Sequence, residues 1–328
     1  MKIHLGDCRE SMRRMIAEGV RVQMCVTSPP YWGLRDYGHP GQLGLEPTPA
    51  EYVANMVEVF RLVRELLADD GTCWINLGDS YAADRGGHCM PAETLAGGVN
   101  GKSDYDDPLR GRVRHKQAMG SRNAPSIGLK HKDLCGIPWR VAFALQADGW
   151  YLRQDIIWAK PNPMPESVTD RCTKSHEYLF LLSKRERYYY DAAAIAEPAI
   201  SAGESRGGGT KVSGNGYAGG ALPPQHLAVY GETPPNRNKR SVWTVATQPY
   251  SEAHFATFPP ALIEPCILAG SRPGDVVLDP FFGSGTTGQV CERLGRKWLG
   301  CELSPEYGKL AAKRTAQQGM MFAQEAAP

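Results

Sequence analysis

The clearest hydrophobic pattern in the chain lies in residues 51–67. Its apolar side chains recur at intervals of three and four residues, which places them on one face of a helix. Asp70-Gly71 follows, and a glycine after such a periodic segment commonly ends a helix, so we expect the helix to stop there. Weaker patterns of the same period predict helices over 9–17, 138–147, 258–269, 286–294 and 304–316.

Short apolar runs rich in β-branched residues alternate with these helices and predict strands. Seven such runs occur, at 2–5, 22–27, 72–77, 152–158, 178–182, 275–279 and 297–301. This alternation is typical of an α/β fold with a mostly parallel sheet, here of seven strands, and helices on both faces. Ligands of such sheets bind beyond the carboxyl ends of the strands, so the residues that follow strands are the candidates for a site.

Two segments, 84–132 and 199–240, lack any apolar period, and the second is rich in glycine and proline. We expect a single domain over 1–328 with these segments as insertions, because neither has the apolar residues to build a core of its own. Their basic side chains can neutralise phosphates of a nucleic acid, although a solvated surface loop is the alternative. These candidates are Arg110, Arg112, Arg114, Lys116, Lys130, Lys132, Arg237, Lys239 and Arg240.

Composition changes this picture little. The net charge of +2, from 37 Lys and Arg against 35 Asp and Glu, neither indicates nor excludes a nucleic-acid partner. None of the nine cysteines forms a C-x-x-C pair, which indicates reduced, buried thiols and no bound metal. No apolar run approaches the about 20 residues that span a membrane, so we expect a cytoplasmic protein without a membrane partner.

One candidate motif is Asp279-Pro280-Phe281-Phe282-Gly283-Ser284-Gly285-Thr286-Thr287, which follows a predicted strand and leads into a predicted helix. Glycines let a backbone approach a ligand closely, and a carboxylate at a strand end can bind an ammonium group. A second acid, Glu302, lies 19 residues after Gly283, where acidic residues bind ribose hydroxyls in nucleotide folds. In letters alone, Gly283, Gly285 and Gly288 also match the G-x-G-x-x-G of dinucleotide-binding folds.

A second motif, Ser28-Pro29-Pro30-Tyr31, follows the predicted strand 22–27. The Ser28 hydroxyl and the Pro29 carbonyl can accept the two hydrogens of an amino group, which would aim the nitrogen lone pair in one direction. Two successive prolines stiffen the turn, and Tyr31 offers an aromatic face for a flat base. An ordinary Pro-Pro turn is the alternative, but the place after a strand favours catalysis.

Together the two motifs resemble those of the S-adenosylmethionine-dependent DNA amino-methyltransferases, and their order, catalytic motif first, is similar to the β-group of that family. Similar stretches also lie at 158–165 and 176–180, so the resemblance covers most of 1–80, 133–191 and 243–316. It implies a Rossmann-like methyltransferase fold with circularly permuted motif order, S-adenosylmethionine as cofactor and double-stranded DNA as substrate. It also allows a homodimer and a cognate restriction endonuclease as partners.

The resemblance also implies roles for single residues. Asp279 would hold the methionine amino group, Glu302 the ribose, and Asp7 the adenine. The other cofactor-binding residues would be Thr257, Phe258, Phe281, Gly283, Gly285 and Thr286. The catalytic turn would consist of Ser28, Pro29, Pro30 and Tyr31.

The residue at position 28 bears on the target base. In this family serine is commoner in enzymes that methylate N4 of cytosine, whereas aspartate or asparagine is usual in adenine enzymes. Ser28 therefore favours a site-specific N4-cytosine DNA methyltransferase, with N6 of adenine as the alternative. Related enzymes that act on RNA or on a protein glutamine carry the cofactor motif first, unlike this chain. A non-enzymatic DNA-binding module with a vestigial pocket is the alternative of another class.

Overall fold

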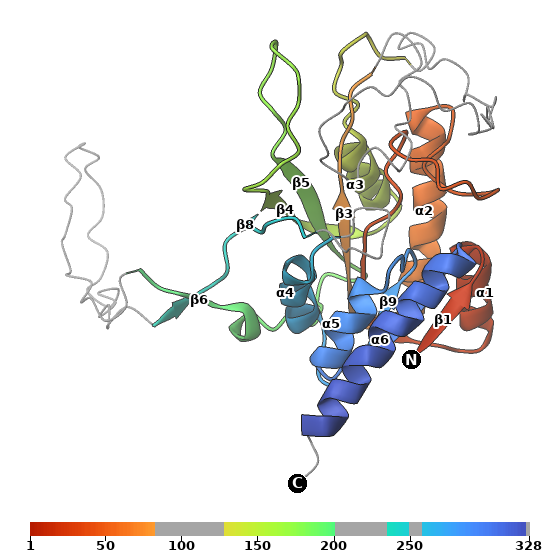
Figure 1. Cartoon of the computed structure of the whole chain (residues 1–328), viewed down its shortest axis with the longest axis vertical. Helices are drawn as coiled ribbons and strands as arrows, with labels where there is room; N and C mark the ends of the chain where they lie inside the picture. The colour runs from red at the N-terminus through yellow and green to blue at the C-terminus, as the bar shows by residue number, and fades with distance from the viewer. Residues whose placement is uncertain (83–127, 201–234, 249–257, 326–328) are drawn as a thin grey trace, which may run out of the picture. The chain divides into compact units, whose positions relative to one another are not determined.

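The computed structural model describes residues 1–82, 128–200, 235–248 and 258–325 (Figure 1). Contacts divide the chain into two units, Met1–Asp191 with Ser241–Pro328, and Ala192–Arg240. The described part of the smaller unit holds a 3-10 turn (Ala193–Ile195) and an antiparallel pair, β6 (Glu197–Pro198) with β7 (Asn236–Arg237). Most of the two expected insertions, 84–132 and 199–240, lies outside the described residues.

The larger unit is built on an eight-stranded sheet with the order β1-β10-β9-β2-β3-β5-β4-β8. The strands are β1 (Lys2–Leu5), β2 (Val22–Thr27), β3 (Leu67–Leu77), β4 (Tyr151–Ala159), β5 (His176–Ser183), β8 (Val242–Thr244), β9 (Val276–Asp279) and β10 (Lys297–Glu302). Of these described strands, β5 runs antiparallel to both of its neighbours, whereas every other pairing is parallel. All seven expected strands are present. The sheet has eight strands rather than seven because the three-residue β8 is too short to leave a periodic signal.

Helices of the larger unit cover both faces of this sheet (Figure 1). On one face α2 (Pro49–Leu66) packs on both α1 (Cys8–Ala17) and α3 (Ile137–Ala147). A second group consists of α4 (Pro260–Gly270), α5 (Thr286–Arg293) and α6 (Pro305–Glu325). The result is the α/β sheet between two helical layers that the alternating pattern predicts.

The sequence of α2 explains its position and its length. Thr48 caps the first turn by accepting a hydrogen bond of 3.2 Å from the Glu51 N–H, and Pro49 suits the first helical position because no partner is needed for its missing N–H. The face at three- and four-residue spacing is buried: Tyr52, Met56, Val59, Phe60, Val63 and Leu66. The hydrophobic period therefore marks the side that packs on the core.

The end of α2 differs from the prediction. The helix ends at Leu66 and β3 begins at Leu67, so Asp70-Gly71 lies within the strand and does not end the helix. The glycine has a packing role instead, because a Cβ at Gly71 would lie 2.9 Å from the carbonyl oxygen of Gln23 in β2. In the sequence Gly71 therefore resembles a residue that ends a helix, whereas in the structure it allows two strands to approach closely.

Candidate active site

The register of two neighbouring strands brings the two sequence motifs together. β2 pairs in parallel with β9, with Cys25 opposite Leu278, so both strands end at the same edge of the sheet. There the Thr27 hydroxyl donates a hydrogen bond of 2.6 Å to Oδ1 of Asp279. The catalytic turn that begins at Ser28 and the glycine loop after Asp279 therefore start from adjacent strand ends.

The carboxylate of Asp279 is buried, with 1% of the residue exposed. In addition to Thr27, the Thr287 hydroxyl donates to Oδ2 at 2.6 Å and the Phe281 N–H donates to Oδ1 at 3.0 Å. Burial raises the pKa of this carboxyl from 3.8 to about 6, although the three hydrogen bonds oppose the shift. All three donors are neutral, so none of them compensates the charge of the ionised carboxylate.

Glu302 ties the glycine loop to the neighbouring strand. Its carboxylate oxygens accept hydrogen bonds from the Gly283 N–H at 2.7 Å and the Ser304 N–H at 2.8 Å. Burial raises the pKa of Glu302, against the effect of these hydrogen bonds. Gly283 has φ of +52°, which favours glycine, and a Cβ built there would meet its nearest neighbour at 3.9 Å. That distance is an ordinary van der Waals contact, so the positive φ and not crowding favours glycine here.

These features fit the group that the resemblance implies, S-adenosylmethionine. A carboxylate offers about four acceptor directions, so three hydrogen bonds leave one at Asp279 for an ammonium group that would compensate the buried charge. Each oxygen of Glu302 likewise retains a lone pair for a ribose hydroxyl.

The start of α5 is fixed by its contact with α6. Gly285 has φ of +82°, and a Cβ there would lie 2.9 Å from the Cβ of Ala311. The Arg314 guanidinium, in a residue that is 7% exposed, donates from Nη1 to Ser284 Oγ and to Thr286 Oγ1, each at 2.9 Å. The Thr286 hydroxyl, which the resemblance assigns to the cofactor, thus has a structural partner in α6.

The other residues that the resemblance assigns to the cofactor lie at the edges of this region or outside the described residues. Asp7 follows β1, which pairs with β10, and its carboxylate caps α1 by accepting the Arg9 N–H at 2.7 Å. The Arg9 guanidinium also donates to Asp7 at 2.6 Å, and this hydrogen bond lowers the pKa of the carboxyl. Phe258 is half-buried just before α4. Thr257 lies outside the described residues.

The catalytic turn leads into a network of polar side chains at the edge of the sheet where β3 and β4 end and the antiparallel β5 begins. Ser28 Oγ and Tyr31 OH lie 3.3 Å and 3.0 Å from Oδ1 of Asn76. The Tyr31 hydroxyl also donates to Oε2 of Glu177 at 2.6 Å, and burial, together with this carboxylate, raises the pKa of Tyr31. The Lys160 ammonium pairs with the other oxygen of Glu177.

Packing fixes the position of the turn and its aromatic ring. The Pro30 carbonyl accepts a hydrogen bond of 2.9 Å from the Tyr52 hydroxyl. Behind the ring of Tyr31 lies Gly78, where a Cβ would approach the ring carbon Cε2 to 2.5 Å. A glycine is therefore needed for the ring to lie where it does. The Pro29 carbonyl, the second expected acceptor, belongs to the same stiffened turn.

The basic residues that we expect to contact DNA are described in part. Two exposed lysines have carboxylate partners, Lys130 with Asp133 at 3.2 Å and Lys132 with Asp170 at 2.6 Å. In the smaller unit three basic side chains surround Glu197 at 3.3–3.7 Å: Arg237, Lys239 and Arg240. Those outside the described residues are Arg110, Arg112, Arg114 and Lys116.

Sequence reasoning missed several residues of the site. Asn76 is a buried amide within an apolar strand, and a polar residue in such a run is a signal because it needs partners. Lys160 and Glu177 lie in the segments that resemble the family, but that resemblance gives them no role. Arg314 leaves no signal, because a charged residue in a helix is usually exposed.

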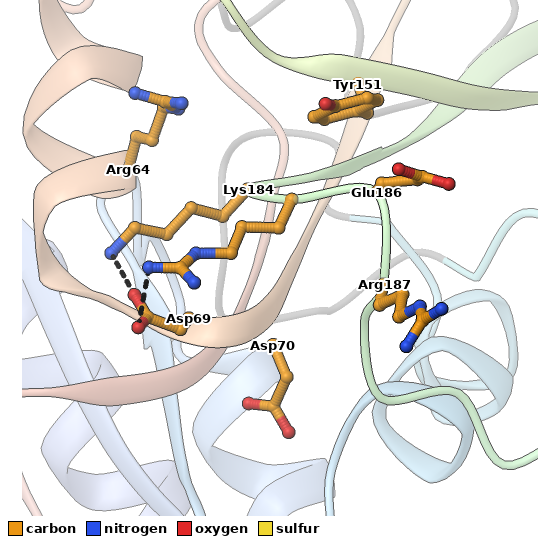
Figure 2. A pocket seen from close by; sticks show the side chains of 8 residues that line it. Arg64, Asp69, Asp70, Tyr151, Lys184, Glu186 and Arg187 are labelled. Carbon is orange, nitrogen blue, oxygen red and sulfur yellow. Dashed lines mark ion pairs between the residues drawn. The ribbon is translucent and has the colours of Figure 1, made fainter.

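A hollow of about 740 Å³ lies away from both motifs. Figure 2 shows side chains that line it. The hollow adjoins the start of β3, whereas Asn76 lies near the end of that strand. Within the hollow Asp69 pairs with Lys184 at 3.5 Å and with Arg185 at 2.8 Å (Figure 2). These ion pairs offset part of the positive charge of the lining. The hollow contains none of the predicted site residues. Its lining consists of Arg64, Asp69, Asp70, Tyr151, Lys184, Arg185, Glu186 and Arg187.

Neither a cluster of metal ligands nor a membrane-spanning helix occurs among the residues that the structure describes. There, no group of three or more histidine, cysteine, aspartate or glutamate side chains could hold a metal ion. No helix among these residues is long and apolar enough to cross a membrane. The cysteines of the described chain are free thiols, and all except Cys172 are buried.

Comparison with known proteins agrees with the geometry. A DNA methylase family, that of the N6 and N4 enzymes, matches residues 22–313. The type II methyltransferase M.SmaI of Serratia marcescens is 47% identical over 313 residues, 95% of this chain and 90% of that protein. The structure of the PvuII DNA methyltransferase, described as cytosine-N4-specific, is similar with a TM-score of 0.58 at 20% identity, covering 95% of this chain and 85% of that one.

A Thermus thermophilus protein solved in complex with S-adenosyl-L-methionine has a TM-score of 0.55 at 23% identity, covering 97% of this chain and 93% of that one. At such identities these structures show a shared fold. The family match spans most of the chain, and the catalytic motif precedes the cofactor motif in the sequence. The chain is a DNA methyltransferase that belongs to the N6/N4 DNA methylase family, with the motif order of its β-group.

Proposed function

We propose that this DNA methyltransferase transfers a methyl group from S-adenosylmethionine to the exocyclic N4 of a cytosine flipped out of the double helix. The observation that carries the proposal is Ser28 at the head of a turn whose strand is joined to Asp279 through Thr27. Serine at this position is commoner among the N4-cytosine members of the family that the sequence resembles. The cytosine-N4-specific description of the PvuII enzyme, which shares this fold, supports the same base.

The catalytic turn would act by orienting the amino group. An exocyclic amino group is a poor nucleophile because its lone pair is conjugated with the ring. S-adenosylmethionine supplies a methyl group on a positively charged sulfur when it is bound. Ser28 Oγ and the Pro29 carbonyl would accept the two amino hydrogens, so that the nitrogen lone pair points at that methyl group. As the new C–N bond forms, the bond between the methyl carbon and the sulfur would break, S-adenosylhomocysteine would be the leaving group, and one amino proton would pass from the nitrogen to solvent.

Tyr31 would hold the extracted base. Base flipping costs a few kcal/mol, and stacking on an aromatic side chain contributes about 1–3 kcal/mol per base. The two quantities are comparable, so a ring fixed in advance offsets much of the cost of extraction. Gly78 behind the ring and Glu177 at its hydroxyl fix it in this way.

The cofactor would lie along the glycine loop. Asp279 would bind the methionine ammonium, because that cation compensates a buried charge whose present hydrogen-bond donors are neutral. Glu302 would bind the ribose hydroxyls and Asp7 the adenine. Residues that would line the rest of the cofactor are Thr257, Phe258, Phe281, Gly283, Gly285 and Thr286.

Recognition of DNA is assigned to the segments 84–132 and 199–240 as insertions in one methyltransferase domain. The basic side chains around Glu197, and Lys130 with Lys132, are proposed to exchange their carboxylate partners for phosphates, which would make binding salt-dependent. A cognate restriction endonuclease, a homodimer and a cytoplasmic location belong to the same proposal. The type II methyltransferase relatives support the endonuclease partner, and the free thiols support the cytoplasmic location.

Mass spectrometry of nucleosides from plasmid DNA tests the target base. DNA treated with the protein and S-adenosylmethionine is expected to contain N4-methylcytosine, and DNA treated with the Ser28→Ala variant far less of it. N6-methyladenine in its place would transfer the proposal to adenine. A protein that methylates neither base and gives no heat of cofactor binding in calorimetry would instead be a non-enzymatic DNA-binding module.

A further inference from the structure

We propose that Glu177 is a positioning residue that sets the direction of the hydrogen bonds at the catalytic turn and so leaves the Ser28 oxygen free to accept from the target base. The inference rests on the proposed function and deepens it. Glu177 acts through Asn76 and Tyr31. No contact of its own with the base is required.

The carboxylate of Glu177 lies among three hydrogen-bond donors. Lys160 Nζ pairs with Oε1, while the Tyr31 hydroxyl and the Asn76 amide donate to Oε2 at 2.6 Å and 3.2 Å. The side chains of Glu177 and Lys160 are 15% and 18% exposed, so the pair is largely removed from water. The register of β4 and β5 places Glu177 opposite Trp158. Lys160 follows Trp158 by two residues, so its side chain lies on the same side of the chain and can reach Glu177.

This carboxylate fixes the orientation of the Asn76 amide. The amide nitrogen donates to Glu177 and to the carbonyl of Tyr178 at 3.1 Å. A reversed amide would turn its oxygen toward these two acceptors, which repel it. Oδ1 of Asn76 must therefore face Ser28 and Tyr31, as an acceptor for a hydroxyl hydrogen.

The same carboxylate decides which hydroxyl uses that acceptor. The Tyr31 hydroxyl has one hydrogen, and an ionised carboxylate at 2.6 Å is a stronger acceptor than an amide oxygen at 3.0 Å. Asn76 Oδ1 thus remains available to the single hydrogen of Ser28, at 3.3 Å. With its hydrogen directed at Asn76, the Ser28 oxygen presents lone pairs to an incoming amino group.

A neutral amide cannot replace this carboxylate. In Glu177→Gln the side chain has one oxygen and one NH₂ group to meet donors on both sides. Either the NH₂ faces the Lys160 ammonium, or it faces the Tyr31 hydroxyl and the Asn76 amide. Both arrangements set donor against donor, and the second releases the Tyr31 hydrogen to compete for Asn76.

The test compares Glu177→Gln with a matched control, Asp148→Asn, which removes a carboxylate that pairs with Arg61 away from this network. Single-turnover methylation of plasmid DNA by Glu177→Gln is expected to be about tenfold to a hundredfold slower, at unchanged cofactor affinity by calorimetry. Asp148→Asn should match the wild type. In a Ser28→Ala background, Glu177→Gln should slow the reaction by less than about threefold, because the oxygen it serves is gone.

Two results would overturn the inference: a Glu177→Gln rate within about twofold of wild type, or an effect that is undiminished in the Ser28→Ala background. If Glu177→Gln does not fold, the double variant Glu177→Gln/Lys160→Met takes its place. There the glutamine NH₂ group can turn toward position 160 without meeting an ammonium group, and the glutamine oxygen can still accept from Tyr31 and Asn76. This double variant should methylate within about tenfold of wild type, and a greater loss would refute the argument that opposed donors cause the defect. A wild-type protein that methylates no DNA would refute the proposed function instead.

Discussion

Replacing Asp279 by asparagine is expected to stabilise the cofactor-free protein at neutral pH and to abolish its affinity for S-adenosylmethionine. Burial raises the pKa of this carboxyl from 3.8 to about 6, so at neutral pH folding buries a charge that the unfolded chain keeps in water. At about 1.4 kcal/mol for each tenfold change in proton affinity, this opposes folding by about 3 kcal/mol. A neutral amide removes the penalty.

The substitution also has a smaller unfavourable effect. The amide nitrogen cannot accept the hydrogen bond that Thr287 donates to Oδ2, and a lost hydrogen bond of this kind costs about 1 kcal/mol. The free energy of unfolding at neutral pH should therefore rise by about 2 kcal/mol in Asp279→Asn. Cofactor binding should be lost, because the ammonium group would meet no negative charge.

The pH dependence identifies the cause. Between about pH 4 and about pH 6 the unfolded chain has lost a proton that folded Asp279 retains, so wild-type stability falls as the pH rises through this window. The variant lacks this dependence, so its advantage should be absent at the acid end and complete above about pH 6. Urea unfolding across this range measures it. Asp275→Asn, at a partly exposed carboxylate just before the same strand, is the control.

Two outcomes would contradict this reasoning. A stability difference that stays constant across the window would show that the charge of Asp279 is not what folding opposes. Undiminished cofactor binding by Asp279→Asn in calorimetry would remove the ammonium-binding role from this residue. In that case the carboxylate would serve only to join β2, the glycine loop and α5 through its three hydrogen bonds.

Three further substitutions separate catalysis from stability. Ser28→Ala should slow single-turnover methylation about 10²- to 10³-fold with unchanged cofactor affinity in calorimetry; equal rates would exclude the orienting role. Gly78→Ala should slow methylation about tenfold, because its Cβ would lie 2.5 Å from the Tyr31 ring; a normal rate at normal stability in urea unfolding would show that the ring position is unimportant. Gly285→Ala should lower the free energy of unfolding in urea by about 1–3 kcal/mol, because φ is +82° and its Cβ would lie 2.9 Å from that of Ala311; an unchanged midpoint would contradict this.

The framework of this protein was predictable because its signals are local. Helical and strand periods extend over a few turns or residues, and both motifs directly follow strands. Since parallel strands of one sheet end at one edge, that placement puts both motifs at the same edge, and the Thr27 hydrogen bond to Asp279 shows that their strands are neighbours there. The end of α2 was misjudged because Gly71 serves strand packing, which has the same appearance in the sequence as a helix stop.

The polar network was not predictable, because it exists only through register. Asn76 reaches Glu177 because Leu77 lies opposite Tyr178, in strands that are about a hundred residues apart in the chain. A slip of one residue would turn these side chains to the other face of the sheet. Register depends on the packing of whole strands, and no short motif around Asn76, Lys160 or Glu177 encodes it.

The reversed direction of β5 gives this enzyme a loop, residues 160–175 between β4 and β5, that could be exchanged for another. Because β5 runs against β4, the connection between them emerges at the edge where β2 and β3 end. Main-chain pairing continues to its base, where the Lys160 N–H donates to the Ser175 carbonyl at 2.8 Å. Backbone bonds therefore hold Lys160 and Glu177 in place independently of the loop's tip, so an engineer could lengthen or exchange the tip without displacing these two side chains.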